Sequence, residues 1–360
     1  MSLAPGEDAA AVRAAIDRVV ASGWFILGPE VDAFETEFAA AMGGRYAVGV
    51  GNGTDAIALI LRGLGIGAGD EVITTPLSAA YSALAIMMAG ARPVFADIDT
   101  SRLTLDPAAI EAAIGPKTRA IVPVHLYGQP ADMAAIERIA SRHNLALVED
   151  CCQAHLATSD GRPVGSIGVA GAFSFYPTKN LGALGDGGAV VTGDRQLAQR
   201  IKRLSNGGQT DRYHHLEPGL NTRLDEIQAA VLRARLGFLP RWTMRRRAMA
   251  ARYRQQLAGA SMEVPPERDS GHVYHLFVVR SPTRAELQAQ LAKNGVETLI
   301  HYPVPIPRQP ALASAAPAEC PVASRVCDEI LSLPLHPGLT DGEIDAVAEA
   351  VRKGQNACVH

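Results

Sequence analysis

The sequence lacks any long uninterrupted apolar run. A membrane-spanning helix takes about 20 predominantly apolar residues, and no stretch of the 360 residues approaches that length. The amino-terminal segment MSLAPGEDAAAVRAAIDRVV carries charges throughout and has no apolar core of a signal peptide, so it predicts an amphipathic helix instead. We therefore expect a cytoplasmic protein with no membrane partner.

An excess of charge of one sign is also missing. The chain has 34 lysines and arginines against 37 aspartates and glutamates, a net charge of -3. Binding to nucleic acid or to an anionic membrane calls for a basic surface, so the composition supports neither partner. Hydrophobic residues at 48% and charged residues at 20% are the balance of an ordinary globular enzyme.

Cysteine is scarce: the chain has five, an odd number, and no C-x-x-C pair. Cys151 and Cys152 are neighbours and cannot readily bridge each other. A disulfide framework and a zinc site are therefore both unsupported, and no metal is expected. We expect the thiols to be reduced and mostly buried.

Short apolar runs alternate with helical patterns over the first two thirds of the chain. The expected strands include YAVGV (46–50), DEVIT (70–74), RPVF (92–95), ALVED (146–150) and GGAVVT (187–192). Continuous apolar strands separated by helices imply the α/β class, with a mostly parallel central sheet and helices on both faces.

A different pattern begins near residue 222. The stretch 222–260 predicts a long helix interrupted by Gly237 and Pro240, and the β-rich HVYHLFVVR (272–280) opens a smaller α+β unit. We expect a large cofactor-binding domain over residues 1–240 and a small C-terminal domain over residues 241–360.

Ligands of an open parallel sheet bind beyond the carboxyl ends of its strands. After the strand at 46–50 comes GNGTDA, in which Gly53, Thr54 and Asp55 open a helix. Exposed N–H groups and the positive end of a helix suit a phosphate. The turn is neither G-x-G-x-x-G nor a Walker sequence, so a plain capped turn is an equally good interpretation.

Two carboxylates, Glu149 and Asp150, end a later strand, and Gln153 follows three residues on. Adjacent strand residues point to opposite faces, so only one carboxylate readily enters a site. A buried carboxylate is costly unless it has a cationic partner. The alternative role for Asp150 is to cap a helix.

Lys179 lies in SFYPTKNLGALGDGG, between aromatic residues and a run of glycines. A lysine that attacks a carbonyl needs partial burial to keep its amine neutral, and the glycines let the backbone approach a bulky group. A Walker lysine is excluded because no Lys-Ser or Lys-Thr follows a glycine here, while a surface turn is the alternative. Together, a phosphate turn, a strand-end Asp150 and Lys179 are what pyridoxal 5′-phosphate requires.

The order of five segments closely resembles the DegT-type sugar aminotransferase family. The segments are NGTDA (52–56), EDCCQAH (149–155), SFYPTKNLGALGDGG (174–188), GLNTRLDEIQAA (219–230) and HYP (301–303), and the resemblance covers nearly the whole chain. It implies a pyridoxal-phosphate-dependent enzyme of the aspartate aminotransferase superfamily (fold type I) that works as a homodimer.

The resemblance also implies roles for the matching residues. Lys179 is expected to form the Schiff base and, once freed, to move the proton between the substrate Cα and the cofactor C4′. Asp150 is expected to pair with the pyridinium nitrogen and Gln153 to lie beside the ring hydroxyl. The other implied contacts are Ser174 and the backbone of Gly53, Thr54 and Asp55 with the phosphate, Asn221 with the phosphate across the dimer interface, and Tyr176, His301 and Tyr302 in the sugar pocket.

The sequence departs from the family where an aromatic residue usually stacks on the pyridine ring. The matching positions are around Ala79 and Ala80, and Tyr81 follows them. Either Tyr81 supplies the ring through a local shift, which we favour, or the wall is small and admits an unusual substrate.

The function implied by the resemblance is transamination by a ping-pong mechanism. L-Glutamate or glutamine would donate the amino group, and a nucleotide-linked keto sugar would accept it. Related dehydratases that use the same cofactor typically carry histidine in place of the lysine, so Lys179 argues against that alternative. A non-catalytic binding or regulatory protein on the same scaffold is the other alternative, and the retained Lys179, Asp150 and phosphate residues argue against it.

Overall fold

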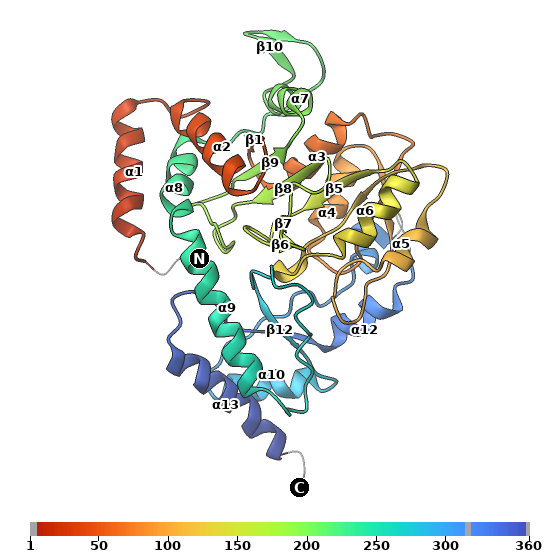
Figure 1. Cartoon of the computed structure of the whole chain (residues 1–360), viewed down its shortest axis with the longest axis vertical. Coiled ribbons are helices and arrows are strands. Elements are labelled where there is room, and N and C mark those ends of the chain that lie inside the picture. Colours follow the sequence, from red (N-terminus) through yellow and green to blue (C-terminus); the bar gives the residue numbers. More distant parts are fainter. Residues whose placement is uncertain (1–5, 314–317, 358–360) are drawn as a thin grey trace.

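A seven-stranded sheet forms the centre of the computed structural model, which describes residues 6–313 and 318–357 (Figure 1). Its strands are β1 (Tyr46–Val50), β2 (Glu71–Thr74), β3 (Arg92–Phe95), β4 (Thr118–Val122), β5 (Ala146–Asp150), β8 (Ala170–Ser174) and β9 (Gly188–Thr192). They lie in the order β1–β9–β8–β5–β4–β2–β3, with β9 antiparallel to both of its neighbours and the others parallel. The predicted α/β class with a mostly parallel sheet is confirmed.

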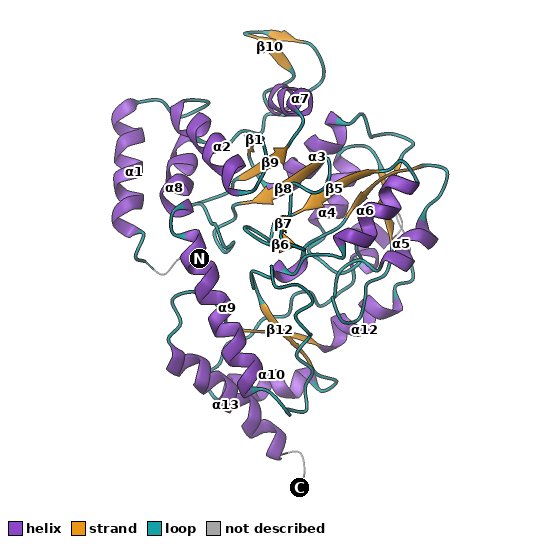
Figure 2. Ribbon diagram, viewed as in Figure 1, coloured by secondary structure: helices purple, strands orange, loops and turns teal. Residues whose placement is uncertain are grey.

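Helices cover both faces of this sheet (Figure 2). One layer consists of α3 (Gly53–Gly63), α4 (Tyr81–Met88) and α7 (Arg195–Ser205). The opposite layer consists of α2 (Pro29–Ala41), α5 (Pro107–Ala113) and α6 (Met133–Arg142), with α8 (Glu226–Leu236) on α2 and α1 (Ala9–Ser22) on α8. Successive strand residues serve opposite layers, since Ile121 packs with α6 whereas Ala120 and Val122 pack with α3.

A second group of elements lies below the sheet in Figure 1 and packs around its own core. It consists of α9 (Leu239–Gln256), β12 (Phe277–Arg280), α10 (Arg284–Lys293), β13 (Ile330–Leu333) and α13 (Asp341–Ala357), and β12 and β13 pair antiparallel. A further core that includes α12 (Pro321–Glu329) and α11 (Pro310–Ala313) packs against residues of the large sheet region. The domain boundary predicted at residue 240 falls in the first turn of α9 and stays a prediction.

Short elements complete the chain. They are the strands β6 (Thr158–Ser159), β7 (Arg162–Pro163), β10 (Gln209–Asp211) and β11 (His214–His215), and the 3-10 turns η1 (Leu126–Gly128) and η2 (Ile306–Arg308). The predicted break in the long helical stretch is confirmed at Gly237, where α8 ends. Pro240 lies in the first turn of α9, where a missing N–H is tolerated.

The strand expected over 272–280 is wrong in its first half, because β12 begins only at Phe277. The N–H groups of Val273 and His275 donate to the carbonyls of Gly128 and Tyr127, in a turn of the sheet region, instead of to a neighbouring strand (3.0 and 2.8 Å). The apolar run therefore serves a contact between the two groups of elements, which a local pattern does not reveal.

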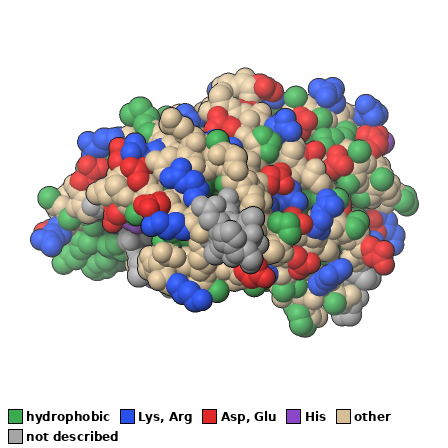
Figure 3. Space-filling model, turned by 90° about the horizontal axis from the view of Figure 1, so that it is seen from below, with side chains coloured by type: hydrophobic (Ala, Val, Ile, Leu, Met, Phe, Trp, Pro, Cys, Tyr) green, Lys and Arg blue, Asp and Glu red, His purple; other side chains and the backbone are tan. Residues whose placement is uncertain are grey.

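The surface seen in Figure 3 carries acidic and basic side chains interspersed. In the described part of the chain, no helix has both the length and the apolar character needed to cross a membrane. Cys151, Cys320 and Cys327 are buried free thiols and Cys152 is partly exposed, while Cys358 lies outside the described residues.

Candidate active site

The carboxyl ends of the parallel strands meet at one edge of the sheet. Gly188, at the start of β9, pairs with both Val50 of β1 and Ser174 of β8. Asp150, at the end of β5, pairs with Ala172 of β8. The structure thus brings together the turn at Gly53, the carboxylate of Asp150 and the loop of Lys179.

The turn that opens α3 is built to receive an anion. Asn52 caps the helix, since its Oδ1 accepts the N–H of Asp55 (2.8 Å). Among the described residues, the N–H groups of Gly53 and Thr54 have no hydrogen-bond partner. A Cβ on Gly53 would lie 2.9 Å from the Cβ of Ser174, so only glycine permits this close approach.

Asp55 has a supporting place in this turn. Its N–H is engaged by Asn52, and its Oδ2 accepts the hydroxyl proton of Thr222 (2.6 Å). The Thr222 hydroxyl oxygen in turn accepts the N–H of Gly51 (2.9 Å). The expected phosphate contacts that lie together are therefore Gly53, Thr54 and Ser174, and Asp55 braces the turn beside them.

Asp150 faces the site and is only 5% exposed. Its Oδ2 accepts the hydroxyl proton of Ser82 (2.7 Å) and its Oδ1 accepts the N–H of Cys152 (3.1 Å). A turn rather than a helix follows Asp150, so the alternative of a helix cap is wrong. Ser82 is a site residue that the sequence reading missed, although it directly follows Tyr81 in the segment where the family places its aromatic residue.

Glu149 points to the opposite face and is fully buried. Its carboxylate accepts the N–H groups of Gly165, Ile167 and Gly168, each at 2.8 Å. His125 Nδ1 accepts the N–H of Ala131 (3.1 Å), so Nε2 carries the proton and donates it to Glu149 (3.1 Å).

Cys151 adjoins this pair, and ligand-type atoms of His125, Glu149 and Cys151 lie within 4.8 Å of one another. Because hydrogen bonds already engage the imidazole and the carboxylate, the cluster supports the end of β5 and offers a metal no free ligand set. The prediction that only one of the two adjacent carboxylates enters the site is confirmed.

Lys179 lies in a tight turn after β8, where its N–H donates to the carbonyl of Tyr176 (2.8 Å). Burial lowers the pKa of its ammonium, and Cys152 and Asp150 partly oppose that shift. Burial also raises the pKa of the Cys152 thiol well above its usual range. The thiol is therefore neutral at pH 7, and of these two neighbours only Asp150 has a carboxylate to oppose the shift.

Three histidines lie near enough to Lys179 for its charge to lower their pKa values. Burial, reinforced by the charge of Lys179, lowers the pKa of His301 and lowers that of His275 well below its usual range. The same causes lower the pKa of His155 to about 3. All three imidazoles are consequently neutral at pH 7 and add no positive charge beside the lysine amine, whose pKa is lowered by burial.

Gln153 and Tyr302 lie together beside Asp150. Gln153 Nε2 donates to the Tyr302 hydroxyl (3.0 Å), and burial raises the pKa of Tyr302 to about 12. His301 Nδ1 lies 2.9 Å from the hydroxyl of Ser332. The HYP segment, far along the chain, thus reaches the edge of the large sheet.

The expected aromatic contacts are more open. Tyr176, next to the lysine turn, is half exposed, and Tyr81, at the start of α4, is 63% exposed. The phenol of Tyr81 lies near enough to Tyr302 to contribute to the raised pKa of Tyr302. Whether Tyr81 stacks on a ring stays a prediction.

Asn221 is exposed, whereas the next residue, Thr222, is buried against the phosphate turn of the same chain. Neighbouring residues of an extended chain point in opposite directions. The side chain of Asn221 is therefore directed away from the site that Thr222 supports.

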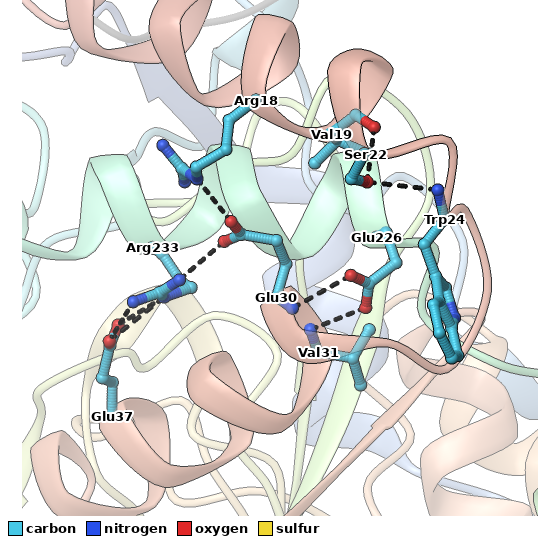
Figure 4. Close-up of polar contacts among 9 residues, drawn as sticks. All are labelled: Arg18, Val19, Ser22, Trp24, Glu30, Val31, Glu37, Glu226 and Arg233. Atoms are coloured by element: carbon cyan, nitrogen blue, oxygen red, sulfur yellow. Dashed lines mark hydrogen bonds and ion pairs between the residues drawn. The ribbon is translucent and has the colours of Figure 1, made fainter.

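An exposed apolar segment, residues 24–27, lies beside the start of α8. Trp24, Phe25, Ile26 and Leu27 are 58%, 47%, 44% and 39% exposed, and Ile26 pairs with Asp225. Figure 4 shows what fixes the start of α2, which follows this segment: the buried carboxylate of Glu226 accepts the N–H groups of Glu30 and Val31 (2.9 and 2.8 Å).

Ion pairs reinforce this joint between α1, α2 and α8. The carboxylate of Glu30 binds Arg18 and Arg233 (2.5 and 2.6 Å), and Arg233 also binds Glu37 (2.6 Å; Figure 4). The carboxylate of Glu226, in the LDEIQ segment, holds the start of α2, a structural function that the sequence did not indicate.

These residues fit pyridoxal 5′-phosphate. The free N–H groups at Gly53 and Thr54 and the adjacent Ser174 suit the phosphate. Asp150 offers a carboxylate that accepts hydrogen bonds from Ser82 and the N–H of Cys152, and it is placed to pair with a protonated ring nitrogen. Lys179 has the lowered pKa that attack on an aldehyde requires.

Comparison with known proteins identifies relatives over nearly the whole chain. Residues 7–352 match the model of the DegT/DnrJ/EryC1/StrS aminotransferase family. The chain is 50% identical over 344 residues to dTDP-3-amino-3,4,6-trideoxy-alpha-D-glucose transaminase of Streptomyces venezuelae, covering 94% of this chain and 91% of that protein. It is 45% identical over 343 residues to dTDP-3-amino-3,6-dideoxy-alpha-D-galactopyranose transaminase of Aneurinibacillus thermoaerophilus, covering 95% and 94%.

A solved structure is similar over nearly the same extent. The crystal structure of S. venezuelae DesV in complex with a ketimine intermediate superposes with a TM-score of 0.95 at 49% sequence identity. The match covers 97% of this chain and 95% of that one.

Proposed function

This chain belongs to the DegT/DnrJ/EryC1/StrS aminotransferase family, and from that premise we propose that it transfers an amino group from L-glutamate or glutamine to a nucleotide-linked keto sugar with pyridoxal 5′-phosphate as cofactor. The observation that carries the proposal is the meeting of Lys179, Asp150 and the turn at Gly53 at one sheet edge. The names of the relatives support the sugar acceptor.

The residues of the chain divide the work. The amine of Lys179 would hold the cofactor and, when free, would move the proton that leaves the donor Cα. When bound, pyridoxal phosphate withdraws electrons from the carbon that bears the amino group. Asp150 would pair with the protonated ring nitrogen, and Ser82 and the N–H of Cys152 fix the orientation of the Asp150 carboxylate by donating to it.

The position that receives the amino group is a finer proposal. Both named relatives are transaminases of 3-amino sugars linked to dTDP. We propose that this enzyme likewise acts at carbon 3. A reverse assay tests this with the cofactor-loaded protein: a dTDP-3-amino sugar should convert the cofactor to its amine form, and the matching dTDP-4-amino sugar should do so at least ten times more slowly. Equal rates would contradict carbon-3 selectivity.

The absorption spectrum tests the function itself. Protein loaded with pyridoxal phosphate should show a visible band that disappears when L-glutamate is added. The Lys179→Ala variant should lack the lysine-linked band and nearly all turnover, because no other amine replaces the nucleophile. Normal turnover in Lys179→Ala would refute the mechanism, and absence of the band from the wild type before L-glutamate is added would refute cofactor binding.

We further propose a homodimer in which Asn221 completes the partner's phosphate site. The outward direction of Asn221 and the exposed apolar segment 24–27 support it, since contiguous exposed apolar residues mark interaction surfaces. Mixed dimers of Lys179→Ala and Asn221→Ala subunits test it.

If Asn221 serves the partner's site, each mixed dimer contains one site with both native residues and should recover close to half of the wild-type activity. If Asn221 serves its own chain's site, neither site is complete and the mixed dimer should be as impaired as its parents. The second result would overturn the shared site while leaving the transaminase function in place.

A further inference from the structure

Tyr127 lies in the turn that follows β4 and is buried in an unusual backbone conformation. Its φ of 59° and ψ of 8° are left-handed, a region that non-glycine residues rarely occupy. Such a conformation costs free energy and persists where surrounding contacts enforce it, often at functional sites. The contacts around Tyr127 show what enforces it.

Each polar group of Tyr127 contacts a different segment. Its N–H donates to Oε1 of Gln153 (2.7 Å). Its carbonyl accepts the N–H of His275 (2.8 Å). Its hydroxyl donates to the carbonyl of His301. One residue of the large sheet region therefore binds the loop after β5 and one segment of the C-terminal region through its backbone, and a second C-terminal segment through its side chain.

These contacts close a ring of hydrogen bonds. Because a backbone N–H can only donate, the Gln153 oxygen must face Tyr127, and its Nε2 must face the hydroxyl of Tyr302 (3.0 Å). The Tyr302 oxygen is thus an acceptor in this bond, and its own proton is left to donate elsewhere. The carbonyl of His301, one residue earlier, completes the ring through the hydroxyl of Tyr127.

The hydrogen bonds around Tyr127 also extend to Asn180, the residue after Lys179. His275, bound to the carbonyl of Tyr127, has its Nδ1 3.2 Å from Oδ1 of Asn180. Asn180 Nδ2 donates to the carbonyl of Val273 (3.2 Å). The Tyr127 turn therefore contacts the Gln153 loop and the HYP segment directly, and it contacts the lysine loop through His275.

Both phenols retain their protons at neutral pH. Burial raises the pKa of Tyr127 well above its usual range and raises that of Tyr302 to about 12. Each hydroxyl is available as a hydrogen-bond donor throughout the pH range in which an enzyme of this kind works.

We propose that Tyr127 is a positioning residue whose hydroxyl holds the His301–Tyr302 segment so that the Tyr302 hydroxyl donates its proton to an oxygen of the bound sugar. This inference rests on the proposed function, because it assigns the sugar to the side of the site bounded by Tyr302. It implies that removing one oxygen atom from Tyr127 weakens sugar binding without touching the chemistry at Lys179.

The test compares two matched variants. Tyr127→Phe keeps the ring and backbone and loses one hydroxyl bond to a carbonyl. Tyr253→Phe makes the same change in the C-terminal core, where the buried Tyr253 donates to the carbonyl of Pro334 (2.9 Å). A merely structural effect of losing a buried hydroxyl should appear equally in both variants.

The first measurement needs neither cofactor nor substrate. Hydrogen–deuterium exchange of the backbone of residues 299–305 should be at least threefold faster in Tyr127→Phe than in the wild type and unchanged in Tyr253→Phe. Equal exchange in all three proteins would overturn the positioning role, whatever the enzyme's activity.

The second measurement separates the two half-reactions of the loaded enzyme, with L-glutamate as donor and dTDP-3-amino-3,6-dideoxy-alpha-D-galactopyranose as the sugar in the reverse direction. Tyr127→Phe should raise the KM for the sugar about tenfold and leave the glutamate step within twofold of the wild type. Tyr302→Phe should do the same, and the double variant should be no worse than either single one.

Additive losses in the double variant, or equal losses in both half-reactions, would show that Tyr127 does not act through Tyr302. Failure of the proposed function has a different signature: the wild type itself would show no cofactor band or no reaction with either substrate. The exchange measurement on the cofactor-free protein would still decide the positioning role in that case.

Discussion

The adjacent carboxylates Asp150 and Glu149 should respond in opposite ways to loss of their charge. Asp150→Asn should fold and lose activity, whereas Glu149→Gln should lose stability. The prediction follows from their hydrogen bonds: Asp150 accepts a hydroxyl and one N–H, while Glu149 accepts three N–H groups and an imidazole. Each substitution changes a single oxygen to an amide nitrogen.

An asparagine at position 150 can keep both bonds. Its oxygen accepts the N–H of Cys152, and its amide nitrogen donates to the hydroxyl oxygen of Ser82, which can act as an acceptor. Replacing charge-assisted bonds by neutral ones costs about 1 kcal/mol. The fold should therefore survive nearly intact.

The chemical cost of Asp150→Asn is larger. Opposite charges about 3 Å apart interact by about 5 kcal/mol at an effective dielectric constant of about 20. Only the part of this energy that grows in the transition state changes the rate. At about 1.4 kcal/mol per factor of ten, we expect the glutamate half-reaction to slow by about 10²- to 10⁴-fold.

A glutamine at position 149 cannot keep its bonds. If its oxygen serves Ile167 and Gly168, its NH₂ group confronts the N–H of Gly165, and His125 can accept from it only by giving up the N–H of Ala131. Two buried donors lose their partners, each at about 1–3 kcal/mol. We expect a loss of about 2–6 kcal/mol in the free energy of unfolding.

Two assays check the pair. Urea denaturation followed by circular dichroism measures the free energy of unfolding, and stopped-flow absorbance with L-glutamate measures the first half-reaction. A stable, inactive Glu149→Gln together with an active Asp150→Asn would refute the assignment of the two faces of β5.

Three further predictions follow from the described contacts. Gly53→Ala should weaken binding of pyridoxal phosphate at least tenfold in an absorbance titration, because the added Cβ would lie 2.6 Å from the Sγ of Cys152. Gly193→Ala is the control, because a Cβ added there would meet no atom within 4 Å. The pKa of His155 is about 3 in the folded chain against about 6.5 in the unfolded chain, so this residue should lower the free energy of unfolding by about 1.4 kcal/mol for each unit that the pH drops from about 6.5 toward 3. The melting temperature of His155→Phe should therefore fall less steeply with decreasing pH than that of the wild type, and equal slopes of melting temperature against pH would contradict the prediction. Trp24→Asp should shift the protein toward monomer in sedimentation velocity, and Met244→Asp, at another exposed apolar position, should not; a dimer unchanged by the first substitution excludes segment 24–27 from the interface.

The sequence alone determined the sheet class and singled out Lys179 and Asp150 as candidate reactive residues. Continuous apolar strands between helical segments predict a parallel sheet through local periodicity, and the structure confirms it. Lys179 and Asp150 could be singled out because their chemistry needs particular residue types at strand ends. Local patterns failed where an apolar run served a distant contact, as in 272–276.

The tertiary structure decided which groups act together. Asp150 receives its hydroxyl partner from Ser82, 68 residues away, and Tyr127 binds the carbonyl of His301, 174 residues away. The hydrogen-bond partner of a polar side chain on a loop cannot be predicted from sequence periodicity, because the order of the strands and the packing of the C-terminal region determine which residues meet. The assembly of the sheet places the side chain of Asp150, and not that of Glu149, at the edge where the Gly53 turn and the Lys179 loop meet. The packing of the C-terminal region places the HYP segment beside it.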